Sequence, residues 1–563
     1  MKKILLVALL VFVIFPEAFL KAQKQGNIWY FGDKVGLDFN SGSPVILTNG
    51  QTYLVDSPPH SEGTAVMSDS SGSLLFYTNG VKVWNRSHMV MPHGDSLAGH
   101  PSSTQAALIV PLPGSKRLYY IFTTAAFQSP SQSLRYSVVD MCLDNGKGDV
   151  LSTQKNILLL DTVTEKLTGV RHANNTDYWI LAHKFYSDAF YAYHLSPGGI
   201  TASVVTHIGS AHPTATAQIG SVIGQMKASP NGKKIALATT NCNPCIAEYF
   251  DFNDANGALS NSVSVHTNSN ASYYGVSFSP DNSKLYISSP INANGLYQFD
   301  LNAGNGNPDS VRASKYKLPT STYTQSGGGY YGNNALQLAT NGKIYITRVP
   351  LQNPFLAVIN NPNNAGISCN YADSAIDFNG KSTSYGLPNF IDSYSYPPAT
   401  ALGPPSVTIS TSSTLSCSGS QVILNATGLA SYTWNTGSTA ATVSVNPVGT
   451  SVYSVQGHNA NGCSASKTFT QNVHVCTGLA SNPDESIHFE IFPNPGHGEL
   501  FVRAIPAISA QFILWNSIGQ PVCSQTLTED KNLVNTAGLS AGLYHYRIIT
   551  PEGKMQSGLI QLE

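Results

Sequence analysis

One short pattern recurs along the first two thirds of the chain and constrains the fold more than any other feature. It is a turn rich in Gly, Asn or Asp, followed at once by a strand of apolar and aromatic residues. Its six clear copies begin at Ser68, Pro113, Asn174, Ser229, Ser279 and Ala339. Successive copies are about 45 to 61 residues apart, a period that is typical of β-propeller blades and longer than most solenoid repeats.

Sheet packing explains why such a repeat closes into a ring. A four-stranded sheet cannot bury both faces alone, whereas radial stacking against neighbouring sheets buries both faces and leaves only short edges. The Asn-Gly and Asp-Asn turns supply the positive φ that tight hairpins need. We therefore predict an all-β protein in which residues 24–396 form a propeller of about seven blades, with six or eight as alternatives. The seventh blade is expected to combine an entry strand at 27–31 with strands from 369–396.

The charge content fits an extracellular all-β protein. Only 11% of the 563 residues are Asp, Glu, Lys or Arg, against a usual share of about 25%, and no long amphipathic helix is evident. The formal net charge of −1 shows no excess of basic residues, which a protein that binds nucleic acid usually has. The sequence therefore predicts no nucleic-acid partner.

Residues 1–22 have the features of a secretory signal peptide. Lys2 and Lys3 precede an apolar run at 4–15, and Ala22 offers a cleavage point. The run is short for a transmembrane helix and no later stretch of 18 apolar residues exists, so we expect no membrane span. The first cysteine is Cys142, far from the cleavage point, which argues against a lipoprotein anchor.

Two smaller β regions follow the propeller. An expected linker at 397–405 leads to short alternating strands between 406 and 476, which predict a β-sandwich. A second linker at 477–488 leads to residues 489–563, where alternating runs predict a small β-sandwich of about seven strands. The prolines of Pro493-Asn494-Pro495 lack backbone donors, so we expect an extended entry there rather than a ladder strand.

The C-terminal region carries three ordered blocks: Pro493-Asn494-Pro495, then LWNSIGQ at 514–520, then LSAGLY at 539–544. It resembles the type A C-terminal sorting domain of the type IX secretion system. The resemblance implies export by the type IX secretion machinery, removal of this domain, and attachment of the remainder to surface glycolipid. It also implies a set of sorting-signal residues: Pro493, Asn494, Pro495, Gly519, Leu539, Gly542 and Tyr544.

Two further details of this region bear on its interpretation: a departure from the family pattern and a motif of another kind. The family usually carries a lysine shortly before an apolar final strand, whereas the nearest lysine here is Lys554. The G-x-S-x-G at 538–542 is followed by a strand rather than the helix that a nucleophile elbow requires, so we predict a turn.

The propeller region carries blocks such as NIWYFG at 27–32, LLFYTNGVKVWNR at 74–86 and GHPSSTQ at 99–105. It resembles a family of secreted propeller proteins that carry type IX sorting domains. That family implies the fold and no settled activity.

The middle region resembles the Ig-like and PKD-like modules of cell-surface proteins through YTWNTG at 432–437 and NGC at 461–463. The resemblance suggests a disulfide between Cys417 and Cys463. A plain Ig topology would instead bring Cys476 near Cys417, and this alternative remains open.

Two groups of residues invite a chemical interpretation and are more simply explained as structure. Cys242 and Cys245 have the redox C-x-x-C spacing, but they lie in an expected loop rather than at a helix N-terminus, so we predict a local disulfide. Several potential zinc ligands at residues 88–100 fit no metal motif, so we predict an exposed loop and neither a metal nor a cofactor.

Six residues are candidates for ligand binding: His100, Ser103, Gln105, Arg171, His172 and His183. The first three lie in the block at 99–105. The others flank a strongly apolar strand and could face the central channel, although polar contacts at a rim are the commoner explanation.

Two functional hypotheses follow. The first is an exported surface protein whose propeller binds an extracellular glycan or protein, with the middle module as a spacer. The second is a secreted glycan lyase or hydrolase with its site at the central channel, which two acids, or a Tyr with His and Arg, converging on the axis would favour. No catalytic motif appears in the sequence, which favours the first hypothesis.

Overall fold

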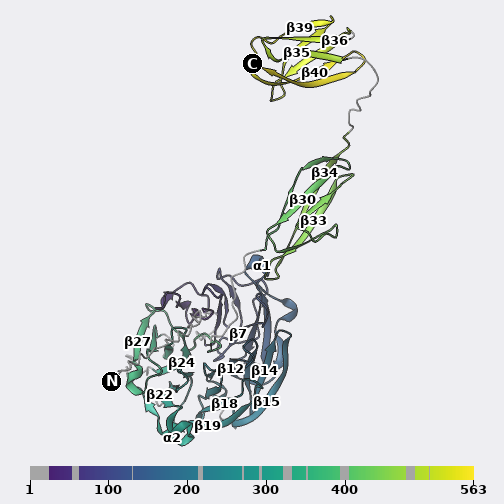
Figure 1. The fold of residues 1–563 in the computed structure, drawn as a ribbon. Helices are drawn as coiled ribbons and strands as arrows, with labels where there is room; N and C mark the ends of the chain where they lie inside the picture. Colours follow the sequence, from purple (N-terminus) through teal and green to yellow (C-terminus); the bar gives the residue numbers. More distant parts are fainter. Residues whose placement is uncertain are drawn as a thin grey trace, which may run out of the picture. The chain divides into compact units, whose positions relative to one another are not determined.

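The computed structural model is a β protein whose parts appear in Figure 1. It describes residues 24–52, 62–127, 129, 131–212, 220–268, 272–290, 295–320, 332–349, 353–393, 405–476, 488–505 and 507–563. The expected signal peptide at 1–22 and most of both expected linkers lie outside these residues. Among the described residues, no helix is both long and apolar enough to cross a membrane.

The described residues between 28 and 377 form seven antiparallel sheets, which make up the propeller. The first three contain β1 (Ile28–Phe31), β2 (Val35–Asp38) and β3 (Val45–Leu47); β4 (Ala65–Ser68), β5 (Leu74–Thr78) and β6 (Val83–Asn85); and β7 (Ala107–Pro111), β8 (Leu118–Thr124), β9 (Leu134–Asp140), β10 (Asp149–Val150) and β11 (Ile157–Leu160). Short helices α1 (Leu143–Gly146) and η1 (Ser152–Gln154) follow β9 and β10.

The remaining four sheets have four strands each. They contain β12 (Val163–Arg171), β13 (Tyr178–Lys184), β14 (Ser187–Ser196) and β15 (Gly199–His212); β16 (Met226–Ala228), β17 (Lys234–Ala238), β18 (Cys245–Phe252) and β19 (Leu259–Asn268); β20 (Val276–Phe278), β21 (Lys284–Ser289), β22 (Gly295–Asp300) and β23 (Tyr316–Lys317); and β24 (Gly332–Leu338), β25 (Ile344–Val349), β26 (Phe355–Ile359) and β27 (Tyr371–Asp377). Helices η3 (Ala303–Gly306), α2 (Pro308–Ala313) and η4 (Gly366–Cys369) lie in the connections.

The six sequence repeats are the first hairpins of six sheets, from β4–β5 to β24–β25. Each of these turns places one residue at positive φ, and these residues are Gly72, Gly114, Asn175, Gly232, Asn282 and Gly342. Gly and Asn are the residues that tolerate this conformation best, which explains the recurring turn composition.

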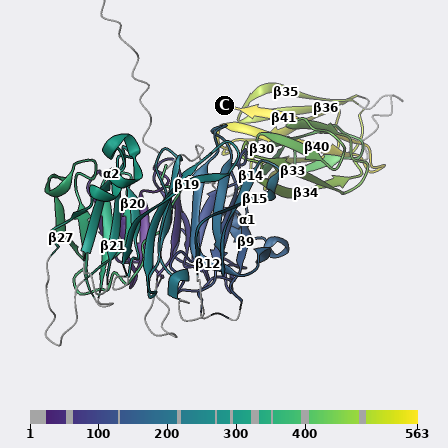
Figure 2. The ribbon, with the colours of Figure 1, turned by 90° about the horizontal axis from the view of Figure 1, so that it is seen from below.

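The first strand of each sheet packs against the first strand of the next one, from β1 through β4, β7, β12, β16 and β20 to β24. In Figure 1 these strands, among them β7, β12 and β24, lie nearer the centre than β15, β22 and β27. Figure 2 shows β12, β19, β20 and β21 running in the same general direction. The inner strands therefore surround a central axis.

The ring does not close through a shared seventh blade, so that part of the sequence prediction is wrong. β1 pairs with β2 and β27 pairs with β26, so the entry strand and the last strand belong to separate sheets. Side chains join the two sheets instead. The Trp29 ring lies 5.6 Å from the Tyr345 ring, and Thr340 donates a 2.7 Å hydrogen bond to Asn27.

The chain then returns through the middle of the ring. Most of residues 383–392 are buried, with Leu387, Asn389, Phe390, Ile391 and Asp392 all at most 4% exposed. Phe390 lies beside Trp29, and Ile391 packs against Gly169 of β12. We name residues 383–392 the axial segment.

The middle module has two sheets that share one apolar core around Trp434 and Tyr453. One contains β28 (Thr408–Thr411), β30 (Val422–Thr427) and β32 (Thr442–Val445), and the other β29 (Leu415–Cys417), β34 (Ser464–His474), β33 (Ser451–His458) and β31 (Ser431–Trp434).

The predicted disulfide between Cys417 and Cys463 is wrong. Cys463 is bonded to Cys142 of the propeller, 321 residues away, with 5.2 Å between the Cα atoms. Cys417 and Cys476 are each disulfide-bonded as well. Cys463 follows the β33–β34 turn, and this turn carries it to Cys142 beside α1 rather than to β29. The middle module is therefore covalently joined to the propeller at a second point of the chain.

The C-terminal unit is a separate β structure with its own core around Phe512, Leu514 and Ile548. Its strand order is β38 (Pro521–Leu527), β37 (Ala510–Trp515), β40 (Gly542–Ile549), β41 (Met555–Leu562), β35 (His488–His497), β36 (Glu499–Ile505) and β39 (Lys531–Asn535).

Pro493-Asn494-Pro495 falls within the bounds of β35 and, as expected, none of its three residues has a partner in the ladder with β36. The pairing of β35 with β36 is interrupted between Phe492 and His497, as the missing proline donors require. The side chain of Asn494 contributes hydrogen bonds to the last strand in their place.

Candidate functional site

Polar side chains on the inner strands gather at three levels of the propeller axis. One group surrounds Glu62 just before β4, one surrounds Lys227 of β16, and one follows Arg171 at the end of β12. Glu165 and Arg171 lie near opposite ends of β12, about 20 Å apart at ~3.3 Å per residue.

The Glu62 group contains two carboxylates. Tyr274 donates a 2.6 Å hydrogen bond to Glu62, and Ser102 lies 3.5 Å from the other oxygen of the same carboxylate. Glu165 accepts three hydrogen bonds of 2.8–3.0 Å, two from Thr104 and one from the backbone nitrogen of Phe127. The Glu165 carboxylate is therefore hydrogen-bonded and buried, whereas Glu62 is partly exposed.

The electrostatics of this group follow from burial. Desolvation, and then the charge of Glu165, raise the pKa of Glu62 to about 8. Burial also lowers the pKa of Lys166 to about 7, against the opposing charge of Glu165. Lys166 donates to the carbonyl oxygens of Ser221, Val222 and Ile223 at 3.0–3.2 Å. Glu62 thus carries a proton at neutral pH and acts there as a hydrogen-bonding group rather than as a charge.

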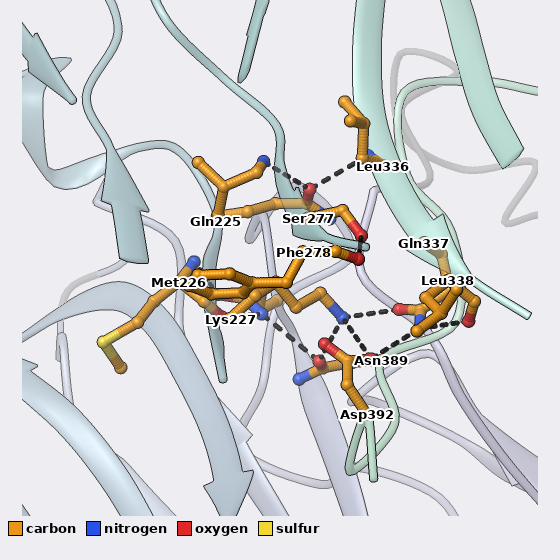
Figure 3. Close-up of polar contacts among 12 residues, drawn as sticks. Gln225, Met226, Lys227, Ser277, Phe278, Leu336, Gln337, Leu338, Asn389 and Asp392 are labelled. Carbon is orange, nitrogen blue, oxygen red and sulfur yellow. Dashed lines mark hydrogen bonds and ion pairs between the residues drawn. The ribbon is translucent and has the colours of Figure 1, made fainter. Parts of the chain in front are cut away.

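The second group crosses the axis, as Figure 3 shows. Lys227 donates to Gln337 and to Asn389, and it lies 3.8 Å from Asp392. Gln337 donates a 2.7 Å hydrogen bond to the same Asp392 oxygen. Burial raises the pKa of Asp392 and lowers the pKa of Lys227, and both side chains are at most 4% exposed.

Two glutamines extend this network between blades. Gln105 accepts from the backbone nitrogens of Leu167 and Met226, and it donates to Asn389. Gln225 accepts from Val276 and Leu336, of which Leu336 appears in Figure 3. These contacts tie the inner strands to one another and to the axial segment, so the axis at this level is filled by the protein's own chain.

The third group lines an open pocket of about 150 Å³ at the end of β12. Residues of the β12–β13 turn, the β16–β17 turn and the β18–β19 turn line it, among them Arg171, His172, Asn175, Ser229, Asn231 and Asp254. We name it the rim pocket.

Contacts within the protein hold the side chains of Arg171 and His172 in place in the rim pocket. Arg171 donates through Nε and Nη2 to the carbonyl oxygen of Asn175, at 3.2 and 2.7 Å. His172 accepts a 2.9 Å hydrogen bond on Nδ1 from the Asn174 backbone, and its ring stacks on Trp179. Because Nδ1 is an acceptor, Nε2 of His172 carries the ring proton.

The six sequence candidates therefore separate into different places. His100 is half-buried and accepts from the Ser102 backbone, while Ser103 bonds Thr124 inside the core. Gln105 belongs to the buried axial network. Arg171 and His172 meet in the rim pocket.

His183 is fully buried beside His212, with 4.6 Å between their ring centroids. Burial lowers its pKa to about 3, so it is neutral at any physiological pH. It is therefore a core residue and does not reach the channel.

The sequence reasoning missed Glu62, Glu165, Lys166 and Tyr274. One signal was present: Glu165 and Lys166 stand side by side in the interior of an apolar inner strand whose other charged residue, Arg171, is at its end. Charges are rare in such positions unless they are paired. Glu62 and Tyr274 had no comparable signal, because only the ring brings them to Glu165.

The cysteine and histidine clusters are engaged in contacts within the protein. Cys242 and Cys245 are joined by a disulfide with 5.0 Å between the Cα atoms. His93 pairs with Asp149 at 2.7 Å rather than with the neighbouring histidines. No group of three metal-ligating side chains is found among the described residues.

One comparison with known protein families identifies part of the chain. Residues 490–561 match the family model described as a secretion system C-terminal sorting domain. This domain indicates secretion to the outer surface or outside the cell, and it implies interaction with the type IX secretion machinery. No curated protein matches the chain in sequence.

Solved structures resemble the chain only distantly. A functionally unknown protein from Desulfotomaculum acetoxidans is 14% identical, with 64% of this chain and 98% of that chain covered and a TM-score of 0.35. PorZ, described as a surface component of the type IX secretion system of Porphyromonas gingivalis, is 11% identical, with 95% and 74% covered and a TM-score of 0.26. The periplasmic gluconolactonase PpgL of Pseudomonas aeruginosa is 12% identical, with 70% and 92% covered and a TM-score of 0.31. At TM-scores this low these likenesses carry no argument, and the propeller assignment rests on the seven sheets themselves.

Proposed function

We propose that this exported protein is an extracellular binding protein whose propeller contacts a glycan or protein ligand at the rim pocket. The observation that carries this proposal is the pocket itself, which is open and presents the pre-positioned side chains of Arg171 and His172. Side chains already held in place lose little entropy on binding, which favours affinity. The middle module, proposed to be Ig-like or PKD-like, is held to the propeller by Cys142–Cys463 and so is more than a flexible spacer.

A screen of the mature full-length protein tests this function. We expect binding to at least one extracellular polysaccharide or surface protein on an array, with no new reducing ends from any glycan that binds. The R171A variant should lose that binding, whereas the R312A variant, which changes an exposed arginine of α2 in another blade, should keep it. Absence of any ligand, or binding that R171A leaves unchanged, would contradict the proposal.

A second candidate function is supported by the Glu62 group. Two carboxylates and Tyr274 do converge near the axis, and Glu62 has the raised pKa of a general acid. The alternative is therefore a glycan lyase or hydrolase that acts at Glu62. Because Glu165 already accepts three internal hydrogen bonds, it is poorly placed to act as the second catalytic carboxylate. Release of reducing ends by the wild type, abolished in E62Q, would establish this alternative instead.

A further inference from the structure

The rim pocket offers more hydrogen-bond donors than acceptors to a ligand. Arg171 uses Nε and Nη2 on Asn175, and no described residue accepts from its Nη1. His172 has its proton on Nε2, and no described residue accepts it. Asn231 uses its side-chain oxygen on Ser229 and Lys233, which leaves its amide Nδ2 without an acceptor in the described chain. These groups suit a ligand that supplies oxygen acceptors.

The charges of the pocket favour an anion of a single charge. Asp254 is the one carboxylate that lines the pocket among the described residues, and it is paired at 2.7 Å with Lys233. Arg171 makes no ion pair with a described carboxylate and therefore remains as one uncompensated permanent charge. One guanidinium with neighbouring neutral donors matches a carboxylate better than it matches a phosphate dianion, which needs more positive charge.

The size and polarity of the pocket further restrict the class of ligand that it can bind. A volume of about 150 Å³ corresponds to roughly five water molecules at ~30 Å³ each. Its wall combines the amide-bearing residues Asn175 and Asn231 with small or apolar residues such as Ala228, Pro230 and Gly232. Amide groups beside apolar surface complement a sugar ring, which carries hydroxyl groups on a carbon framework.

We propose that the rim pocket binds the carboxylate of an acidic sugar, a hexuronate residue, through the open Nη1 edge of Arg171 and the Nε2 proton of His172. This proposal rests on the proposed binding function and names the class of ligand that the pocket takes. The Asn231 amide contacts a hydroxyl group of the sugar.

Titration of the full-length protein with D-glucuronate tests the proposal, with D-glucose as the neutral match and succinate as a carboxylate without a sugar ring. Ligand-observed NMR or calorimetry should show that glucuronate binds at least about tenfold more tightly than either. Against glucose the difference comes from the hydrogen bonds between the carboxylate and Arg171, and against succinate it comes from the hydrogen bonds of the sugar hydroxyl groups. Raising the salt concentration should weaken the glucuronate complex. Equal binding of glucose and glucuronate, or of succinate and glucuronate, would overturn the proposal.

Two variants with opposite expected effects on glucuronate binding distinguish the loss of a specific contact from damage to the fold. R171Q should weaken glucuronate binding at least about tenfold, while R312Q should leave it unchanged. D254N should strengthen it, because the carboxylate is removed and Lys233 gains a free charge beside the pocket. A merely damaged pocket would weaken binding in D254N as well, and that result would contradict the proposal.

The results also distinguish the acidic-sugar proposal from the proposed binding function of the propeller. If the full-length protein binds polymers or proteins but not glucuronate, the binding function stands and the acidic-sugar inference fails. If it binds glucuronate and no larger ligand, the pocket assignment stands and the proposed binding function fails.

Discussion

The side-chain oxygen of Asn494 accepts a 2.9 Å hydrogen bond from the backbone nitrogen of Gln561, 67 residues further along the chain. Its amide nitrogen also donates to the carbonyl oxygen of Leu559 at 3.2 Å. The prolines on either side of Asn494 have no N–H to offer, so this side chain supplies the hydrogen bonds that the backbone cannot. The first strand of the sorting domain is thereby joined to its last one.

Replacement of Asn494 by alanine should therefore destabilise the sorting domain. Two hydrogen bonds are lost at an exposed position, so we expect a loss of about 1–2 kcal/mol in the free energy of unfolding. Urea unfolding of the full-length protein, monitored through a signal from the C-terminal unit, measures this loss of stability. S517A, which changes an exposed turn residue of the same domain, is the matched control and should change little. An N494A variant as stable as S517A would show that the two bonds contribute nothing.

The sequence predicted the repeated part of the fold because that part is encoded locally. Each of the six turns needs a residue at positive φ, and Gly or Asn stands there in every copy, as at Gly232 and Asn282. The sheets follow from these hairpins together with the apolar strands beside them.

The axial network and the disulfide pattern could not be predicted in the same way. Gln105 bonds Asn389 across 284 residues, and Cys142 bonds Cys463 across 321. No local pattern marks such pairs. The first contact depends on the axial segment returning through the ring, and the second depends on the β33–β34 turn of the middle module lying beside α1. The candidate site illustrates both cases: Arg171 and His172 were found from the end of an apolar strand, whereas Glu62 and Tyr274 meet only in three dimensions.

The raised pKa of Glu62 predicts a pH-dependent stability. Its folded-state pKa of about 8 lies above the ordinary value of 4.5, so the folded state holds the proton more tightly. The contribution is fully present below pH 4.5 and is lost as the pH rises through 8, by at most about 1.4 kcal/mol per pH unit. The unfolding free energy of the wild type should thus fall relative to E62Q between these values. Parallel profiles for wild type and E62Q would contradict the assignment.

Lys227 should be the most sensitive single residue of the axis. K227M leaves the buried carboxylate of Asp392 without its cation, and breaking a buried pair in this way costs about 3–5 kcal/mol. Chemical unfolding of the full-length protein measures this loss. The double variant K227M/D392N should recover part of the stability, because the uncompensated charge is removed. A double variant less stable than K227M would show that the charge of Asp392 is not the cause.

The bond between Cys142 and Cys463 should hold the propeller and the middle module together after the main chain between them is cut. A specific protease site placed at residues 394–404, which follow the axial segment, allows this cut. On a non-reducing denaturing gel the cut wild type should run as one species, and a reductant should separate it into two. C463S should separate without reductant, whereas C245S, which removes the local Cys242–Cys245 bond, should not. Separation of the cut wild type under non-reducing conditions would show that this disulfide is not formed, and the middle module would then be a spacer joined to the propeller by its linker alone.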